Sequence, residues 1–464
     1  MQANLEQHKH SITISHLTKT VQDAIQVVRN LGLRYLWVDS LCIIQDDKED
    51  WLREAGRMAS VYEGSYFTIA ASASKDGSGG CLVSQATKSL VRVPCEIDDA
   101  SKGYMYFGVK EDKDPTKRLF DGALNKRAWV MQEHLFARRT IHFAEDQLYW
   151  ECDKYLMGQE RNTGDRALVE MRVPMRAFLL CILGDFLGPE LMPHLVKDPP
   201  QDKFELADYH SWWLNMIEFF STCGLTKASD KLPALLSLST ELAKLTGDEY
   251  IDGHWLGQES QYRFLSSLLW CAKDKQPLEK LTQFRAPSWS WAALDGPLGF
   301  VDKLWYYVPS IFHPEATELS LLKVQNFEPA GMPVRRSLLL SGVMIPATRK
   351  MDGLEAPPLF SEQCMACERF KDMECIRING ENGEEVVGGF TFDTSDYQPD
   401  KFWLLPIYTR WVERQRLAPI YYVLIIAEVS GQKVSGMVFE RVGVGHIEDA
   451  RMASGRKKQF LVLT

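Results

Sequence analysis

The sequence predicts an α/β domain followed by a mainly helical region and then a β-rich region. In the first part, amphipathic helical patterns alternate with short apolar runs, which is typical of strands and helices packed in layers. Between residues 160 and 295 apolar residues recur at helical spacing. Beyond residue 300, short apolar runs are separated by Gly-, Asn- and Glu-containing turns. We therefore predict three parts, residues 1–155, 156–300 and 301–464.

Two helices are expected early in the chain. Residues 18–31 carry apolar side chains on one helical face, and Gly32 is a natural stop. Residues 48–62 carry a second apolar face, and either Asp46 or Asp47 can cap the start of that helix. The acidic residues of its first turn also favour the helix dipole.

Short apolar runs next to these helices predict the strands of a small parallel sheet. The first strand is expected at residues 35–39 and the second at residues 66–73. Asp39 then stands at the carboxyl end of a strand, the edge at which open α/β sheets bind ligands. It can position a ligand there, or cap the turn that follows.

The rest of the first part predicts more strands and one helix. We expect strands at residues 91–97 and 104–109, a helix at residues 124–138, and a hairpin that joins residues 140–144 to 147–152. Farther along, strands are expected at residues 337–343, 401–408, 420–429, 434–441 and 459–463.

Composition excludes several classes of protein. Among 464 residues, 45% are hydrophobic and 25% charged, and the net charge of −9 offers no basic field for nucleic acid. The most apolar run, residues 177–183, is too short to span a membrane. The ten cysteines lack a framework spacing, which favours a reduced, cytoplasmic protein. Cys364, Cys367 and Cys375 have no evident fourth ligand, so we expect no metal site.

Several sequence blocks share an order and spacing typical of one known family. The blocks are residues 34–47, 50–62, 67–71, 127–133, 139–143, 147–152, 230–235 and 285–292. Together they resemble the fungal HET (heterokaryon incompatibility) domain across about residues 12 to 295, and the match is far more specific than a lone short motif.

The resemblance implies a role in non-self recognition, in which the domain triggers programmed cell death as a signalling or interaction module. Protein partners are then expected, either an incompatibility partner or a second copy. Family members usually begin with an earlier strand and a Ser-Tyr-x-Trp-Gly-like segment, which this sequence does not show. The domain is therefore expected to be amino-terminally truncated, and an inactive, degenerate copy is a further alternative.

A second alternative comes from a distant similarity of the HET domain to TIR domains. Many TIR domains cleave NAD with one helical glutamate that follows a tryptophan-containing segment, and Glu54, after Trp51, is the position here that most resembles it. NAD would be a substrate rather than a cofactor, and the carboxylate would stabilise an oxocarbenium-like state. From spacing alone, Glu54 is more typical of a solvated acid that pairs with Arg57 or Arg53 on the helix surface.

A second polar group lies on the helix expected at residues 124–138. Trp129 and Glu133 share a helical face, and Arg127 and Gln132 are close in sequence. These four residues, with Asp39 and Trp51, are candidates for a ligand- or partner-binding surface. The alternative is a buried polar network that holds the helix on the sheet.

Other patterns favour structural roles. The acids Asp46, Asp47, Glu49 and Asp50 lack the spacing of a calcium loop and predict a solvated helix start. No Ser or Cys is paired in sequence with His134 or His142, so no hydrolase triad is predicted. Trp289 and Trp291 can stack on a ring but are more typical of a packed core.

Overall fold

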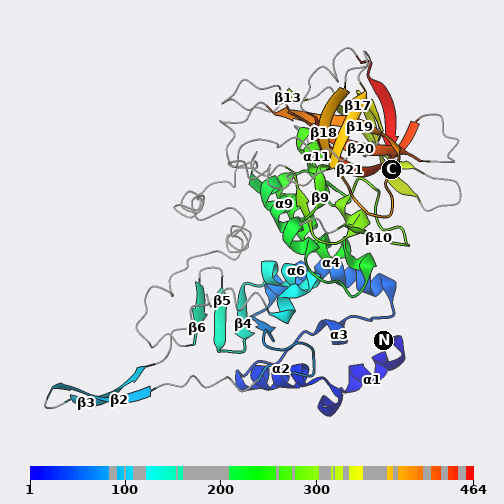
Figure 1. Ribbon diagram of the computed structural model, residues 1–464. Coiled ribbons are helices and arrows are strands. Elements are labelled where there is room, and N and C mark those ends of the chain that lie inside the picture. Colours follow the sequence, from blue (N-terminus) through cyan, green and yellow to red (C-terminus); the bar gives the residue numbers. More distant parts are fainter. Residues whose placement is uncertain are drawn as a thin grey trace. The chain divides into compact units, whose positions relative to one another are not determined.

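The computed structural model describes most of the chain and divides it into two compact units. Unit 1 comprises Met1–Ile182 and Cys223–Leu238, and unit 2 comprises Leu183–Thr222 and Ser239–Thr464. Each unit is described by itself (Figure 1). The described residues are 1–82, 91–98, 101–107, 122–152, 155–159, 208–257, 261–273, 277–301, 315–316, 319–327, 334–348, 374–379, 385–410, 420–429, 437–447 and 456–464.

Unit 1 contains the two early helices that the sequence predicts. Helix α2 covers Lys19–Asn30 and buries Ala24 and Val28. Helix α4 covers Lys48–Gly64, and the Asp47 carboxylate caps it by accepting from the amides of Glu49 and Asp50. The other helices of this part are α1 (Leu5–His10), α3 (Asp39–Cys42) and α6 (Ala128–Phe136), with short 3₁₀ turns η1 (Gln2–Asn4), η2 (Ile14–His16) and η3 (Ala123–Lys126).

The main sheet of unit 1 is mixed rather than parallel. Its strands follow the order β1-β4-β5-β6, with bounds Thr68–Ala70, Arg139–Phe143, Leu148–Cys152 and Tyr155–Gly158. β1 and β4 run parallel, whereas β4, β5 and β6 are joined as antiparallel neighbours. The predicted hairpin at residues 140–152 is therefore confirmed. A separate antiparallel pair, β2 (Val91–Asp98) and β3 (Ser101–Phe107), matches the other two predicted strands.

The predicted strand at residues 35–39 was wrong. Val38 has extended dihedral angles, but Asp39 begins helix α3, and Tyr35 is 84% exposed. A strand needs a partner for its backbone hydrogen bonds. Among the described residues no strand pairs with this segment, so its apolar composition gives an extended connection instead. Asp39 consequently begins a helix and does not end a strand.

A segment from much later in the sequence completes unit 1. The amide of Gly224 donates to the Lys126 carbonyl at 2.7 Å, and the Ala128 amide donates to the Gly224 carbonyl at 3.0 Å. The Ser237 hydroxyl donates to the Ala55 carbonyl of α4 at 2.8 Å. Between these contacts lie the 3₁₀ turns η6 (Ala228–Asp230) and η7 (Pro233–Leu235). Residues 223–238 therefore fix the start of α6 and the middle of α4.

The middle region in unit 2 mixes helices with short strand pairs, which the prediction of a mainly helical region did not include. Its helices are α9 (Asp208–Ser221), α10 (Leu236–Thr246) and α11 (Gln261–Ser267), the first residues of α10 belonging to unit 1. Its strands are β7 (Glu249–Ile251), β8 (His254–Leu256), β9 (Trp270–Ala272), β10 (Glu279–Lys280), β11 (Leu294–Asp295) and β12 (Leu298–Phe300), and the 3₁₀ turn η8 covers Trp291–Ala293. The most apolar run of the sequence, residues 177–183, lies outside the described residues.

Trp289 and Trp291 lie in the core of unit 2, both with no exposed surface. The Trp291 indole N–H donates to the Gly253 carbonyl at 3.0 Å, as does that of Trp213. Gly253 has φ +100°, and a Cβ there would lie 2.5 Å from the Trp291 ring nitrogen, so this close approach requires glycine. These two tryptophans are therefore not surface stacking platforms.

The carboxyl-terminal part is β-rich, as predicted. A 10-stranded sheet has the main path β13-β19-β20-β21-β22-β15-β14, with β16 paired to β19, and β18 paired to β17 and β21. The strand bounds are β13 Glu315–Ala316, β14 Ser320–Phe327, β15 Arg335–Gly342, β16 Ile345–Thr348, β17 Glu374–Asn379, β18 Glu385–Phe392, β19 Lys401–Arg410, β20 Ile420–Glu428, β21 Met437–Ile447 and β22 Gln459–Leu463. Within the described parts of the chain, no helix has the length and apolarity to cross a bilayer.

Candidate functional site

Helices α4 and α6 of unit 1 pack against each other through three matched pairs of side chains. The rings of Trp51 and Trp129 meet edge to face, with centroids 5.7 Å apart. The next pair lies one turn farther along α6 and two turns farther along α4, where the Gln132 amide nitrogen is 3.4 Å from the Met58 sulfur. Tyr62, on the next turn of α4, hydrogen bonds with Glu133. From the first pair to the third, the contacts advance toward the carboxyl-terminal end of both helices.

The third pair is the centre of a charged cluster. Burial, together with the charge of Asp39, raises the pKa of the Glu133 carboxyl to about 7, although the Tyr62 hydrogen bond and Arg127 act to lower it. Burial and Glu133 also raise the pKa of Tyr62, so its hydroxyl stays protonated and can donate. Trp37 packs edge to face on the Tyr62 ring at 5.9 Å. The cluster thus holds a carboxyl that titrates near neutral pH.

Asp39 reaches this cluster from a different element than the sequence predicted. It begins α3, where its carboxylate accepts from the Ser40 amide at 2.6 Å, and it is exposed. Arg127, also exposed, precedes the first residue of α6. Asp39 and Arg127 therefore act on the half-buried Glu133 as two exposed charges of opposite sign. Of the predicted residues, Asp39, Arg127 and Glu133 come together electrostatically, and Tyr62 is a member that the sequence reasoning missed.

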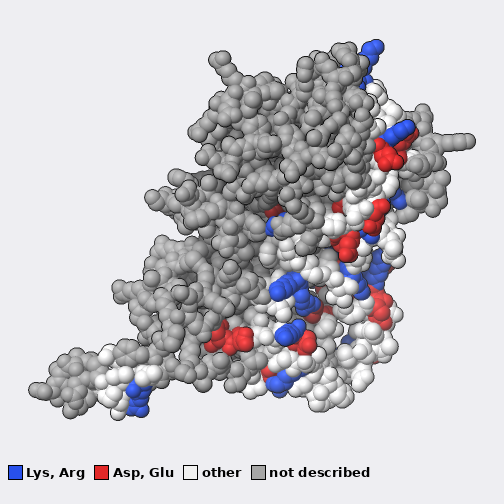
Figure 2. Space-filling view, in the orientation of Figure 1, with Lys and Arg blue, Asp and Glu red and all other residues white. Residues whose placement is uncertain are grey.

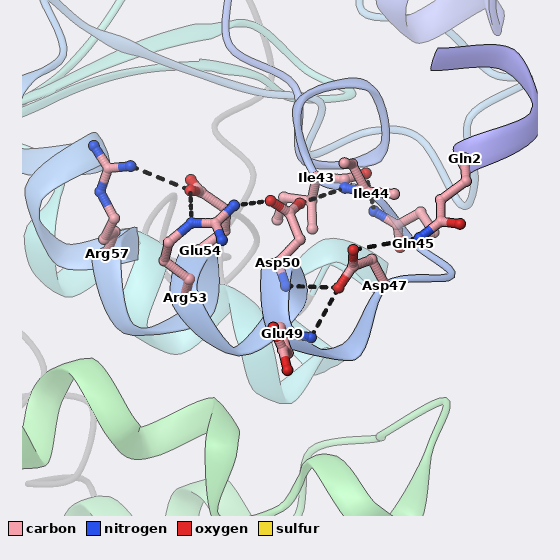
Figure 3. A network of polar contacts seen from close by, with 10 residues as sticks. All are labelled: Gln2, Ile43, Ile44, Gln45, Asp47, Glu49, Asp50, Arg53, Glu54 and Arg57. Atoms are coloured by element: carbon pink, nitrogen blue, oxygen red, sulfur yellow. Dashed lines mark hydrogen bonds and ion pairs between the residues drawn. The ribbon is translucent and has the colours of Figure 1, made fainter.

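Glu54 makes a different set of contacts. Its carboxylate lies 3.2 Å from an Arg57 nitrogen and 3.5 Å from the Arg53 Nε, and its side chain is 15% exposed (Figure 3). Arg53 also pairs with Asp50, whose other oxygen accepts from the Ile44 amide at 2.8 Å. Glu54 therefore makes the ion pairs with Arg53 and Arg57 that its spacing on the helix predicts. The acids at the start of α4 serve as cap and ion-pair partners there.

The sequence match covers this cluster. Residues 1–133 match the family model described as heterokaryon incompatibility protein (HET), and Glu133 is the last residue of that match. The chain carries a HET domain. Neither a curated protein nor a solved structure matches the chain.

Gln132 is the most deeply buried polar residue of the HET domain's α6, with 0% of its surface exposed. Its amide nitrogen has the Met58 sulfur as a weak acceptor. Among the described residues, no donor reaches its amide oxygen. An unmatched buried amide oxygen costs about 1–3 kcal/mol, so this position destabilises the α4–α6 packing unless a further donor is supplied.

A third group of polar residues follows the HET match directly. His134, His142 and Glu151 present nitrogen and oxygen atoms within 4.8 Å of one another. Burial lowers the pKa of His134 to about 4, with Glu151 opposing this effect and His142 adding to it. From the sequence alone, the two histidines stood only as possible partners of a serine or cysteine. The missed signal was the register of the predicted hairpin, which places Glu151 diagonally across from His142.

Neither the charged surface nor a depression in unit 2 offers a stronger candidate. On the face shown in Figure 2, acidic and basic side chains of the described residues are interspersed, without a broad basic patch. A depression of about 630 Å³ in unit 2 is lined by residues of β7, β8, β14 and β15, including Glu249, Lys323 and Arg336. No predicted site residue lines it, so the HET-domain cluster remains the principal candidate.

Proposed function

We propose that the HET domain acts in fungal heterokaryon incompatibility as a signalling and interaction module that triggers programmed cell death. The family match across residues 1–133 carries this proposal. The partner surface is the region around the charged cluster, with Asp39 and Arg127 as its exposed charges. An incompatibility partner or a second copy of the chain would pair with these charges, since complementary charges give specificity to protein interfaces.

The geometry supports an interaction role for this cluster. Asp39 and Arg127 are exposed, come from separate elements and flank a half-buried carboxyl. A partner that covers them would desolvate Glu133 further and favour its neutral form. Trp51 and Trp129 pack helix α4, which carries Tyr62, on helix α6, which carries Glu133. Binding at this surface is therefore coupled to the protonation of Glu133.

Expression of the full chain in a filamentous fungus tests the proposal. We expect inducible expression to kill the cells, and the variants Asp39→Asn and Arg127→Gln to weaken death because each removes one exposed charge. Loss of such a contact lowers partner affinity by about tenfold, equivalent to about 1.4 kcal/mol. The readout is the fraction of viable cells at matched protein levels.

The matched controls are Glu63→Gln, at an exposed position on the last turns of α4, and Arg29→Gln, at an exposed position on α2. Both should kill as the unchanged chain does. Undiminished death with Asp39→Asn and Arg127→Gln would contradict the proposed surface. Absence of death with the unchanged chain in every host strain would instead favour an inactive copy.

A second function, TIR-like cleavage of NAD, is favoured by one observation. Glu54 follows Trp51 on α4, and its carboxylate is largely shielded from solvent. A shielded carboxylate beside an aromatic ring can stabilise a developing oxocarbenium ion. Its two arginine partners oppose this role, because they already neutralise its charge. The enzyme is therefore the weaker of the two candidates.

Nicotinamide release from NAD by the purified full chain separates the candidates. If the second function holds, Glu54→Gln lowers the rate by about 10²- to 10³-fold, the range for loss of one electrostatic stabiliser. Glu49→Gln, at an exposed position on the first turn of the same helix, should leave the rate unchanged. No release from a folded sample excludes the enzyme, and release that survives Glu54→Gln excludes Glu54 as its carboxylate.

A further inference from the structure

Three potential metal ligands converge in unit 1 from three different elements. His134 lies on α6, His142 on β4 and Glu151 on β5, and their ligand atoms all lie within 4.8 Å of one another. All three side chains are at least nine-tenths buried. His134 precedes the β4–β5 hairpin that carries His142 and Glu151. Only the fold therefore brings the three ligands together.

The hairpin fixes two of the ligands. In the β4–β5 register, His142 is opposite Tyr149 and Thr140 is opposite Glu151. His142 and Glu151 are therefore diagonal neighbours on one face of the pair. The His142 Nε2 lies 2.6 Å from a Glu151 oxygen. Helix α6 adds the third ligand, with the His134 ring stacked on that of His142 at a centroid distance of 5.5 Å and an angle of 13°.

The other nitrogen of His142 has its own partner. The Ser72 hydroxyl, just beyond β1, lies 3.3 Å from the His142 Nδ1. Metal-bound histidines almost always use their second nitrogen for such a hydrogen bond, which fixes the ring and its tautomer. With Nδ1 held by Ser72, Nε2 is the nitrogen that points to Glu151 and to the centre of the group.

A hydrogen bond between His142 and Glu151 would by itself account for two of these residues. Helix α6 brings a second buried imidazole, that of His134, to the same point. Two imidazole nitrogens and one carboxylate oxygen are a common ligand set for zinc and other divalent transition metals. Calcium and magnesium prefer sets made of oxygen alone.

We propose that His134, His142 and Glu151 bind a divalent transition-metal ion, with zinc as the best fit. Three protein ligands leave a fourth tetrahedral position for water or another donor. Metal–ligand distances of about 2.0–2.2 Å place tetrahedral ligand atoms about 3.3–3.6 Å apart. The His142–Glu151 pair would therefore open slightly while the most distant ligand atoms approach. The ion would fasten α6 to the β4–β5 hairpin, and this site does not depend on the proposed function of the HET domain.

Metal uptake by the full chain tests the site. Tag-free protein stripped with a chelator should take up one zinc ion at this site, and the site should also accept cobalt(II). The cobalt form should show visible absorption typical of tetrahedral coordination, without a thiolate charge-transfer band. A folded, stripped protein that takes up neither ion overturns the proposal, as does a thiolate band from the only bound cobalt.

Variants assign the ligands. Glu151→Gln keeps the shape of the side chain and a hydrogen-bonding oxygen, and His134→Asn removes one ring. Each should weaken zinc binding by well over tenfold in protein that remains folded by circular dichroism. Ser72→Ala, a positioning residue, should weaken it by roughly 10- to 100-fold. The control His16→Gln, at an exposed position before α2, should bind as the unchanged chain does. Undiminished affinity in either folded ligand variant would overturn the assignment.

Discussion

Replacing Arg441 with Met is expected to lower the free energy of unfolding of unit 2 by about 3–5 kcal/mol. The Arg441 guanidinium is fully buried and lies 2.9 Å from a carboxylate oxygen of Asp393. It also donates to the Trp270 carbonyl and lies over the Trp270 ring, 3.1 Å from its centroid. Removing it leaves Asp393 as an uncompensated buried acid. Burial already raises the pKa of Asp393 to about 6 even with Arg441 opposing that rise.

Hydrogen exchange of the β9 and β21 amides in increasing denaturant would measure this loss within unit 2. The double variant Arg441→Met with Asp393→Leu serves as the control, because it removes both charges and should recover most of the stability. The loss in Arg441→Met should also shrink as the pH falls, since Asp393 then becomes neutral. An Arg441→Met protein as stable as the unchanged chain at pH 8 would contradict this role of the pair.

The helices of unit 1 could be predicted because the residues that determine each helix are close together in the sequence. Helix α4 has a capping Asp47, acids in its first turn and an apolar face, and it covers nearly the predicted residues. The hairpin of β4 and β5 was likewise predicted from two apolar runs around a short turn. In each case the residues that determine the element are its own or its immediate neighbours.

The failures were cases in which a distant partner decides the outcome. Residues 35–38 have the composition of a strand, but whether they form one depends on a neighbouring strand. The mixed direction of the sheet also depends on pairing, since β1 pairs with β4 rather than with a strand before it. Composition cannot specify these partners, which explains why the predicted parallel sheet was only partly right.

The candidate site could likewise be predicted only where local sequence determines it. Asp39, Arg127 and Glu133 were chosen from sequence blocks, and they share one electrostatic cluster. Tyr62 could not be added to them, because nothing in the sequence indicates which acid its hydroxyl meets. The His134–His142–Glu151 group was missed because two of its members are brought together by strand register and the third by helix packing.

Glu133→Gln is expected to have little effect on stability near pH 5 and to stabilise the chain near pH 8. In the native state burial raises the pKa of Glu133 from 4.5 to about 7, against the effects of Tyr62 and Arg127. Between these values the native state binds more protons than the unfolded state, so stability falls as the pH rises through this window. The full loss above pH 7 is on the order of 3 kcal/mol.

The difference between the unchanged chain and Glu133→Gln isolates this carboxyl from other groups that titrate in the same range, such as His134 and Asp393. Glutamine keeps an oxygen that can accept from Tyr62, so the hydrogen bond itself is preserved. Hydrogen exchange of the α4 and α6 amides at pH 5 and pH 8, corrected for the intrinsic exchange rates, would give the two differences. The control Glu63→Gln, at an exposed position, should show no pH-dependent difference.

If Glu133→Gln and the unchanged chain differ equally at both pH values, Glu133 does not titrate between them. A partner that desolvates Glu133 shifts the protonation equilibrium of this same carboxyl. Without titration of Glu133 in this range, partner binding would therefore not be linked to its protonation.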